Sequence, residues 1–297
     1  MNTMSEAIAA IDLAGIFADA GGASEGPKTY VLVDPSGMPE LAARLRRSPR
    51  PAINLFRLDG DLAAQAVSPL LLPWHIDPAA PAPELERWLA DAGRTSASVL
   101  WLASPLSQDA LARRLASRVS ALLTDDMEVV LRYFDTRVFE VLLRVLPQQQ
   151  RDDFLGPAVQ WVYWNRRCEL VRVAARFDEN ERLAELPMRL DADTEAALIE
   201  ASEPDQIAEM LDKTVPEQYR AIPFPERFDF IRRHWQAARA LGIEAAADHS
   251  LYCALALLYG EDFAQQAQWK AGLERVSRRE LGLAELTQSL EAQEEQV

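Results

Sequence analysis

The chain has 297 residues, of which 49% are hydrophobic and 26% are charged, a composition typical of a globular protein rather than a disordered or fibrous one. Its 46 acidic and 31 basic residues give a net charge of −15, which argues against a nucleic-acid-binding protein, because such proteins use Lys and Arg to displace counterions. The same charge disfavours binding to an anionic membrane, and two cysteines are too few for a disulfide-rich scaffold.

The first half of the chain alternates predicted strands and helices. The segments with strand composition are 30–33 (YVLV), 53–56 (INLF), 99–102 (VLWL), 127–134 (MEVVLRYF), 159–164 and 169–173. Helices are predicted at 38–47, 84–92, 107–123 and 136–146, and Asp135 is placed to cap the last of these. The 127–134 segment is nearly continuously apolar, as expected of a strand covered on both faces.

The second half has few strand signals, and its apolar spacing predicts helices at 193–201, 205–213, 226–241 and 249–259. Ser202 and Pro204 are helix-start signals for the second of these. We therefore expect an α/β fold, with an N-terminal α/β lobe that has a mixed sheet, followed by an all-helical C-terminal lobe. The expected bounds are 1–28 for an N-terminal segment, 29–176 for the α/β lobe, 177–287 for the helical lobe and 288–297 for a polar tail.

The main charge-free apolar stretches are much shorter than a membrane span. The first twenty residues contain three acids and no base, unlike the start of a signal peptide. We therefore expect a soluble, cytoplasmic protein.

No catalytic, metal-binding or cofactor-binding motif is recognisable. The glycine-rich segment 21–29 fails as a phosphate loop because Pro27 precedes its lysine and a strand, not a helix, follows it. His249 and Cys253 lie four residues apart on one predicted helix and could hold a metal together with Cys168, but a second paired spacing is missing. Buried structural cysteines are the better interpretation, so we predict no metal and no cofactor.

Two groups of residues stand out. Arg132 lies inside the predicted 127–134 strand, where an unpaired charge is costly, so we expect a structural ion pair with Asp135 in addition to the helix cap. Trp161, Trp164 and Arg166 have the composition of interface hot spots. Core packing explains Trp161 equally well, which leaves Trp164 and Arg166 as the better candidates for binding a partner.

The order of several motifs is similar to that of one bacterial family. The motifs are YVLVD at 30–34, SPLL at 68–71, RYFDTRV at 132–138, LP at 146–147 with Gln150, FLGP at 154–157 with Trp161, and later Gly242-Ile243, Asp248 and Gly260 with Phe263. Taken together, they resemble the adaptors of type VI secretion effectors over about residues 29–265. Thr136 stands where the family pattern leads us to expect proline, a change that the first helical position tolerates.

The resemblance implies a chaperone that binds a toxic effector and helps to load it onto the VgrG spike protein, without being an enzyme. It also implies an α/β lobe followed by a helical lobe, and it gives Arg132, Asp135 and Trp161 no catalytic role.

Two other hypotheses for the function stay open. One is an enzyme with a site between the lobes, drawn from His75, His249, Cys253 and nearby acids. The other is an immunity-like inhibitor whose acidic surface blocks a basic toxin.

Overall fold

The structure is a computed structural model that describes residues 26–47, 50–56, 67–74, 83–180 and 187–294. The chain divides into two compact units, Met1–Leu198 and Ile199–Val297. The sequence placed the boundary between residues 176 and 177. The structure places it later, because the short strand β9 (Met188–Arg189) pairs with β5 (Ser120–Leu122) of the first unit.

The first unit is built on a six-stranded sheet with the strand order β2-β3-β1-β4-β7-β8, in which every neighbouring pair is antiparallel. These strands are β1 (Lys28–Val33), β2 (Ile53–Asn54), β3 (Leu70–Pro73), β4 (Val99–Ser104), β7 (Gln160–Trp164) and β8 (Leu170–Ala174). The predicted strands at 30–33 and 99–102 and the predicted pair at 159–164 and 169–173 are thereby confirmed.

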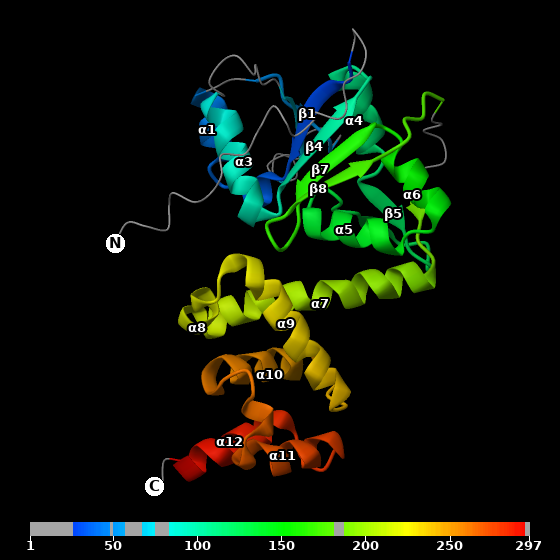
Figure 1. Ribbon diagram of the computed structural model, residues 1–297. Helices are drawn as coiled ribbons and strands as arrows, with labels where there is room; N and C mark the ends of the chain where they lie inside the picture. The colour runs from blue at the N-terminus through cyan, green and yellow to red at the C-terminus, as the bar shows by residue number, and fades with distance from the viewer. Residues whose placement is uncertain (1–25, 48–49, 57–66, 75–82, 181–186, 295–297) are drawn as a thin grey trace. The chain divides into compact units, whose positions relative to one another are not determined.

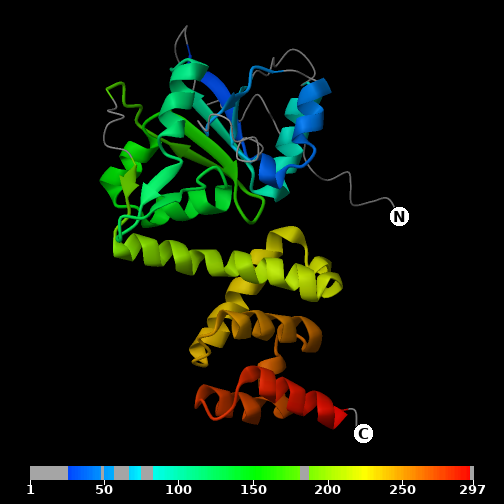
Figure 2. The same ribbon diagram turned by 180° about the vertical axis from the view of Figure 1, so that it is seen from behind.

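Helices cover both faces of this sheet. Because successive side chains of a strand point to opposite faces, β1 sends Leu32 to one face and Val31 and Val33 to the other. Leu32 packs in a core with α4 (Gln108–Ala116), α5 (Thr136–Val145) and α6 (Gln148–Leu155). Val31 packs in a second core with α1 (Leu41–Arg47) and α3 (Glu84–Ser96). Figure 1 and, from behind, Figure 2 show these helices on the two sides of the sheet.

A second, three-stranded sheet corrects two predictions. The predicted helix at 107–123 ends at Ala116, and its last residues form β5, because Val119 and Ala121 alternate with polar Ser120 as in a strand. The predicted strand at 127–134 shrinks to β6 (Glu128–Val130), whose Val130 is exposed rather than covered on both faces. The order is β6-β5-β9, with one antiparallel and one parallel pair, so the mixed sheet is this smaller one.

The second unit is helical, which confirms the expected fold class of an α/β part followed by a helical part. It contains the rest of α7 (Ala192–Thr214), then α8 (Pro216–Ala221), α9 (Phe224–Ala240), α10 (Ala246–Tyr259), α11 (Ala267–Ser277) and α12 (Leu283–Glu294). The predicted central role of the 249–259 helix is confirmed, because α10 packs against α8, α9 and α12.

One helix replaces the two that were predicted at 193–201 and 205–213. Helix α7 continues through Pro204, although proline removes a backbone hydrogen bond there. Its apolar residues on both sides of the proline are packed in cores: Leu198 before it, and Ile207 and Leu211 after it. This packing outweighs the local helix-start signal.

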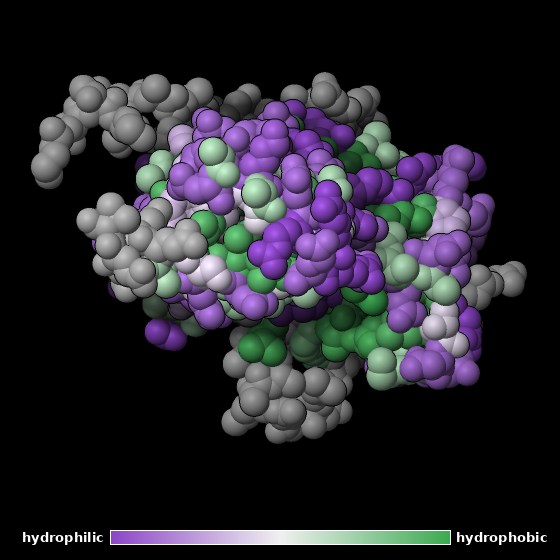
Figure 3. Space-filling model, turned by 90° about the horizontal axis from the view of Figure 1, so that it is seen from below, coloured by the Kyte–Doolittle hydropathy of each residue, from purple (hydrophilic) through white to green (hydrophobic). Residues whose placement is uncertain are grey.

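The surface reflects the charged composition. Hydrophilic residues predominate on the face seen in Figure 3, and hydrophobic residues gather in separate areas between them. Within the described ranges, none of the helices combines the length and the apolar character that crossing a bilayer requires.

Candidate functional site

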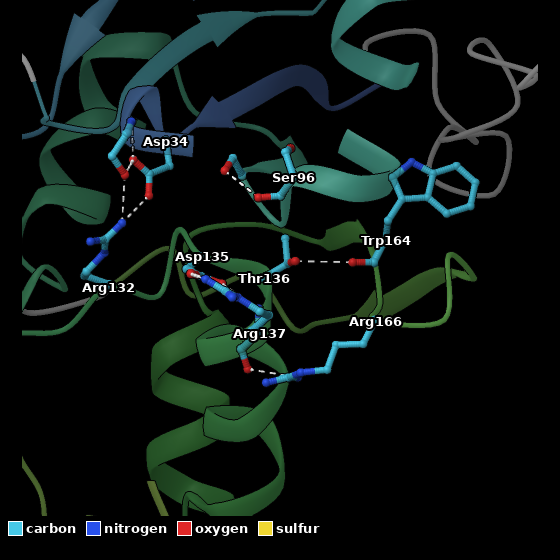
Figure 4. Close-up of polar contacts among 10 residues, drawn as sticks. Asp34, Ser96, Arg132, Asp135, Thr136, Arg137, Trp164 and Arg166 are labelled. Atoms are coloured by element: carbon cyan, nitrogen blue, oxygen red, sulfur yellow. Dashed lines mark hydrogen bonds and ion pairs between the residues drawn. The ribbon is translucent and has the colours of Figure 1, made fainter. Parts of the chain in front are cut away.

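Four segments of the first unit meet where β1 and β7 end and β4 begins (Figure 4). The amide of Asp34, after β1, donates to the carbonyl of Ser98 at 2.9 Å. The amide of Thr136, at the start of α5, donates to the carbonyl of Ala97 at 2.8 Å, and its hydroxyl donates to the carbonyl of Trp164 at 3.2 Å. The YVLVD and RYFDTRV motifs, far apart in sequence, are therefore joined in one junction.

The carboxylate of Asp34 is the most buried charge in this junction, with a side chain 3% exposed. It accepts hydrogen bonds from the amide of Ser36 at 2.9 Å, from the hydroxyl of Ser36 at 2.6 Å and from Nη2 of Arg132 at 2.6 Å. The side chain of Arg132 is itself 51% exposed. Its guanidinium thus neutralises a buried acid, while about half of the side chain stays accessible to solvent.

The predicted ion pair between Arg132 and Asp135 is wrong. Strand β6 ends at Val130, so Arg132 lies in the following loop and not inside an apolar strand. From that loop its side chain reaches Asp34, at the end of β1. The partner of Asp135 is Arg137, whose Nε and Nη2 donate to the two carboxylate oxygens at 3.0 and 2.7 Å.

The predicted cap of α5 is confirmed. Oδ1 of Asp135 accepts a hydrogen bond from the backbone amide of Arg137 at 2.9 Å. The side chain of Arg137 is 42% exposed. The side chains of Arg132 and Arg137 are therefore both partly exposed at this junction, and arginine can donate to the carboxylates of a partner.

Trp164 and Arg166 are packed inside the unit rather than displayed on its surface. Trp164 is 9% exposed, and the guanidinium carbon of Arg94 lies 5.1 Å from its ring centroid. The side chain of Arg166 is 11% exposed, and its Nη1 donates to Oε2 of Glu140 at 2.8 Å. Burial raises the pKa of neighbouring Tyr163 to about 12, with Glu140 raising it and Arg166 lowering it.

Trp161 belongs to the core. Its side chain is fully buried, its indole nitrogen donates to the carbonyl of Leu155 at 3.1 Å, and its ring stacks on Phe139 with centroids 5.2 Å apart. This burial leaves none of its surface for a partner, so the core interpretation of Trp161 replaces the partner-binding one.

Of the remaining chemical candidates, His249 and Cys253 lie on the same helix, α10, and Cys168 lies in the first unit. His75 lies outside the described residues. Cys168 donates to the carbonyl of Arg94 at 3.2 Å, and Cys253 is buried in α10, where burial raises the pKa of its thiol to about 12. His249 contacts the carboxylate of Glu203 through Nδ1 and the carbonyl of Ile243 through Nε2, the latter at 2.9 Å. Over the part of the chain that the structure describes, no three His, Cys, Asp or Glu side chains are grouped to hold a metal.

A match to a known family covers most of the residues that form this junction. Residues 29–153 match the family model DUF4123, described as a domain of unknown function. The DUF4123 segment contains Asp34, Arg132, Asp135 and Arg137, and it ends before Trp161. It covers the first part of the resemblance inferred from the motifs, which extends to about residue 265. No curated protein and no solved structure matches the chain.

Sequence reasoning missed the role of Asp34. The sequence analysis placed it in the YVLVD motif but did not pair it with Arg132, from which 98 positions separate it. A usable signal was present, because an acid that is buried at the end of a strand is usually paired or hydrogen-bonded, and the second motif of the DUF4123 segment offers two arginines.

Proposed function

We propose that this protein is a non-enzymatic cytoplasmic adaptor that binds a type VI secretion effector and promotes its loading onto the VgrG spike. The observation that carries the proposal is the DUF4123 match, together with the ordered motifs that resemble effector adaptors. The junction adds support, because the motif residues Asp34, Arg132 and Asp135 are tied to one another's segments by hydrogen bonds. The partners of this adaptor are the effector and the spike protein.

The proposal also assigns a surface. Arg137 belongs to the DUF4123 segment and is substantially exposed, and arginine is enriched among the residues that dominate binding energy at interfaces. Arg132 supports buried Asp34, and Arg137 supports Asp135 through two hydrogen bonds, so the loss of either arginine acts on folding as well as on binding. Effector contact is tested on Arg137, and the unfolding midpoint of the variant is measured beside its affinity so that the two effects are separated.

The test is affinity purification of the tagged protein from its native cells, with the partners identified by mass spectrometry and then re-expressed with it. Recovery of a spike protein and a large toxin is the expected result. Arg137→Ala should then lower the affinity for that toxin about thirtyfold or more, the size of an interface hot spot. Arg279→Ala is the matched control, because Arg279 is an exposed arginine, 75% accessible, that pairs with Glu244 in the second unit.

Three outcomes are informative. If deletion of the gene leaves secretion of the toxin unchanged, the adaptor proposal fails. If the toxin binds through its catalytic domain rather than its delivery region, the protein is an inhibitor instead. If both arginine variants bind equally well, only the assignment of the surface fails.

A further inference from the structure

Helix α10 has an apolar outer face that the described part of the second unit leaves exposed. The opposite face of the helix is packed in the core, where Tyr252 is among the buried residues. Ala247 and Leu258 are exposed, Leu258 by 51%, and Leu251 and Ala254 between them are partly exposed. At about 100° per residue, these four positions fall within about 60° of one another around the helix, so they form one outer seam of α10.

The outer seam of α10 lies on a helix without ionised side chains. From His249 to Gly260 the sequence contains no Asp, Glu, Lys or Arg. Helices at the surface of soluble proteins normally carry charged and polar residues on the outer face, so an apolar outer face indicates a further contact. A partner that placed a charged side chain against this seam would bury it without a counter-charge, which is costly. The partner therefore has to be apolar as well.

The spacing of the seam predicts that this partner is a helix. The four positions follow one another by four, three and four residues, as the a and d positions of a coiled coil do. Small and large side chains alternate along the seam, so close packing requires a facing helix that sets large against small. An antiparallel second copy of α10 does so at every position. Ala247 then faces Leu258 of the second copy, and Leu251 faces Ala254. A parallel copy would set alanine against alanine and leave gaps.

We propose that α10 packs antiparallel against α10 of a second copy of this chain, about a two-fold axis between Leu251 and Ala254. Both copies use the same patch, so the pair is closed and adds no further copies. A single helical seam buries less than the roughly 1,600 Å² of a standard interface, so the association is weak and reversible. This contact does not depend on the proposed function.

Net charge opposes this association rather than driving it. Each copy carries a net charge of −15, so two copies repel each other, and salt screens that repulsion. The acids that flank the seam are paired within their own chain, Glu244 with Arg279 at 2.6 Å and Glu261 with Arg233 at 2.8 Å. The association should therefore tighten as salt is raised, whereas an interface held by ion pairs would weaken.

Sedimentation equilibrium tests whether the pair forms through this seam. The mass of the wild-type protein should rise from 33.2 kDa toward twice that value at concentrations up to about 0.5 mM, and more steeply at high salt. Leu258→Glu sets an unpaired charge against the seam of the other copy and should weaken the association at least about tenfold. Met210→Glu is the matched control, because Met210 is comparably exposed, at 47%, but lies on α7.

Disulfide cross-linking tests the antiparallel orientation. In a Cys168→Ser background, in which the remaining Cys253 is buried, Ala247→Cys and Leu258→Cys are prepared separately, mixed and oxidised. The two new cysteines face each other in the antiparallel pair. In either variant alone they lie about 16 Å apart along the helices, which is beyond the reach of a disulfide. The mixture should therefore cross-link at least about tenfold faster than either variant alone, or than Ala247→Cys mixed with Met210→Cys.

Each of the remaining outcomes overturns the proposal. The mass can stay at the monomer value at every concentration, or Leu258→Glu can associate as tightly as the wild type. Single variants that cross-link faster than their mixture indicate a parallel pair. If the wild type is monomeric and Leu258→Glu loses a different protein partner, the seam belongs to that partner and not to a second copy.

Discussion

The contact between Arg132 and Asp34 gives the sharpest stability prediction. Removing one partner of a fully buried ion pair costs about 3–5 kcal/mol. Arg132 is only half-buried, so water screens the pair, and Asp34 keeps two hydrogen bonds from Ser36 when the arginine is lost. We therefore expect Arg132→Ala to lower the free energy of unfolding by about 1–2 kcal/mol, the value of one screened hydrogen bond to a charged group.

The same geometry predicts a larger effect for Asp34. Asp34→Ala leaves the amide of Ser36 without its side-chain acceptor and removes the arginine's anchor, so we expect a loss of about 2–4 kcal/mol. The double variant should be less destabilised than the sum of the two. The difference, about 1 kcal/mol, is the interaction energy of the pair.

The assay is urea unfolding followed by tryptophan fluorescence, since Trp74, Trp101 and Trp161 are buried in the first unit and report on its unfolding. Arg189→Ala is the matched control. It breaks an ion pair with Asp126 in which both side chains are largely exposed, so a change below about 1 kcal/mol is expected. If Arg132→Ala unfolds at the wild-type midpoint, or if the two single changes add within about 0.3 kcal/mol, the pair does not stabilise the junction.

Three further changes test separate parts of the fold. A Cβ added at Gly272 would overlap Cδ1 of Leu286 and lie 3.1 Å from its Cγ, so Gly272→Ala should cost about 1–3 kcal/mol in thermal or urea unfolding. The cost should shrink when Leu286→Ala is also present, and simple additivity would contradict the overlap. Folding raises the pKa of Cys253 to about 12, so the unfolded thiol ionises first as pH rises above about 9, and the folded state loses stability there. Wild type should therefore lose more stability than Cys253→Ala between about pH 8 and pH 10, and equal losses would refute the burial effect. Ala97 has a left-handed backbone with φ 52°, so Ala97→Gly should raise the free energy of unfolding by up to about 1 kcal/mol, and a decrease would refute the strain.

The features that the sequence predicted well are set by local chemistry. The 30–33 and 99–102 strands are short apolar runs between turn or polar residues, and such runs form buried strands whichever neighbour they pair with. The cap of α5 depends only on an aspartate placed before a helical pattern. Neither inference needed knowledge of distant contacts.

The features that the sequence missed depend on contacts between distant segments. The 127–134 run was predicted to be one long buried strand. Only three of its residues pair with β5, and Arg132 leaves the strand to reach an acid that periodicity does not identify. Pro204 was predicted to begin a helix, but packing on both sides of it continues α7. In each case tertiary packing outweighed a local signal.

The contacts of the junction show whether its sequence motifs maintain the fold or recognise a partner. Asp34, Asp135 and Thr136 are occupied by hydrogen bonds to their own chain, so a family likeness that rests on them reports a common scaffold rather than a particular partner. A protein that recognises one effector needs exposed groups that differ from those of related proteins, because specificity is a difference between affinities. On this reasoning, substitutions at the internal motif residues should act on folding and on all partners alike. Substitutions at exposed positions outside these motifs should discriminate between effectors.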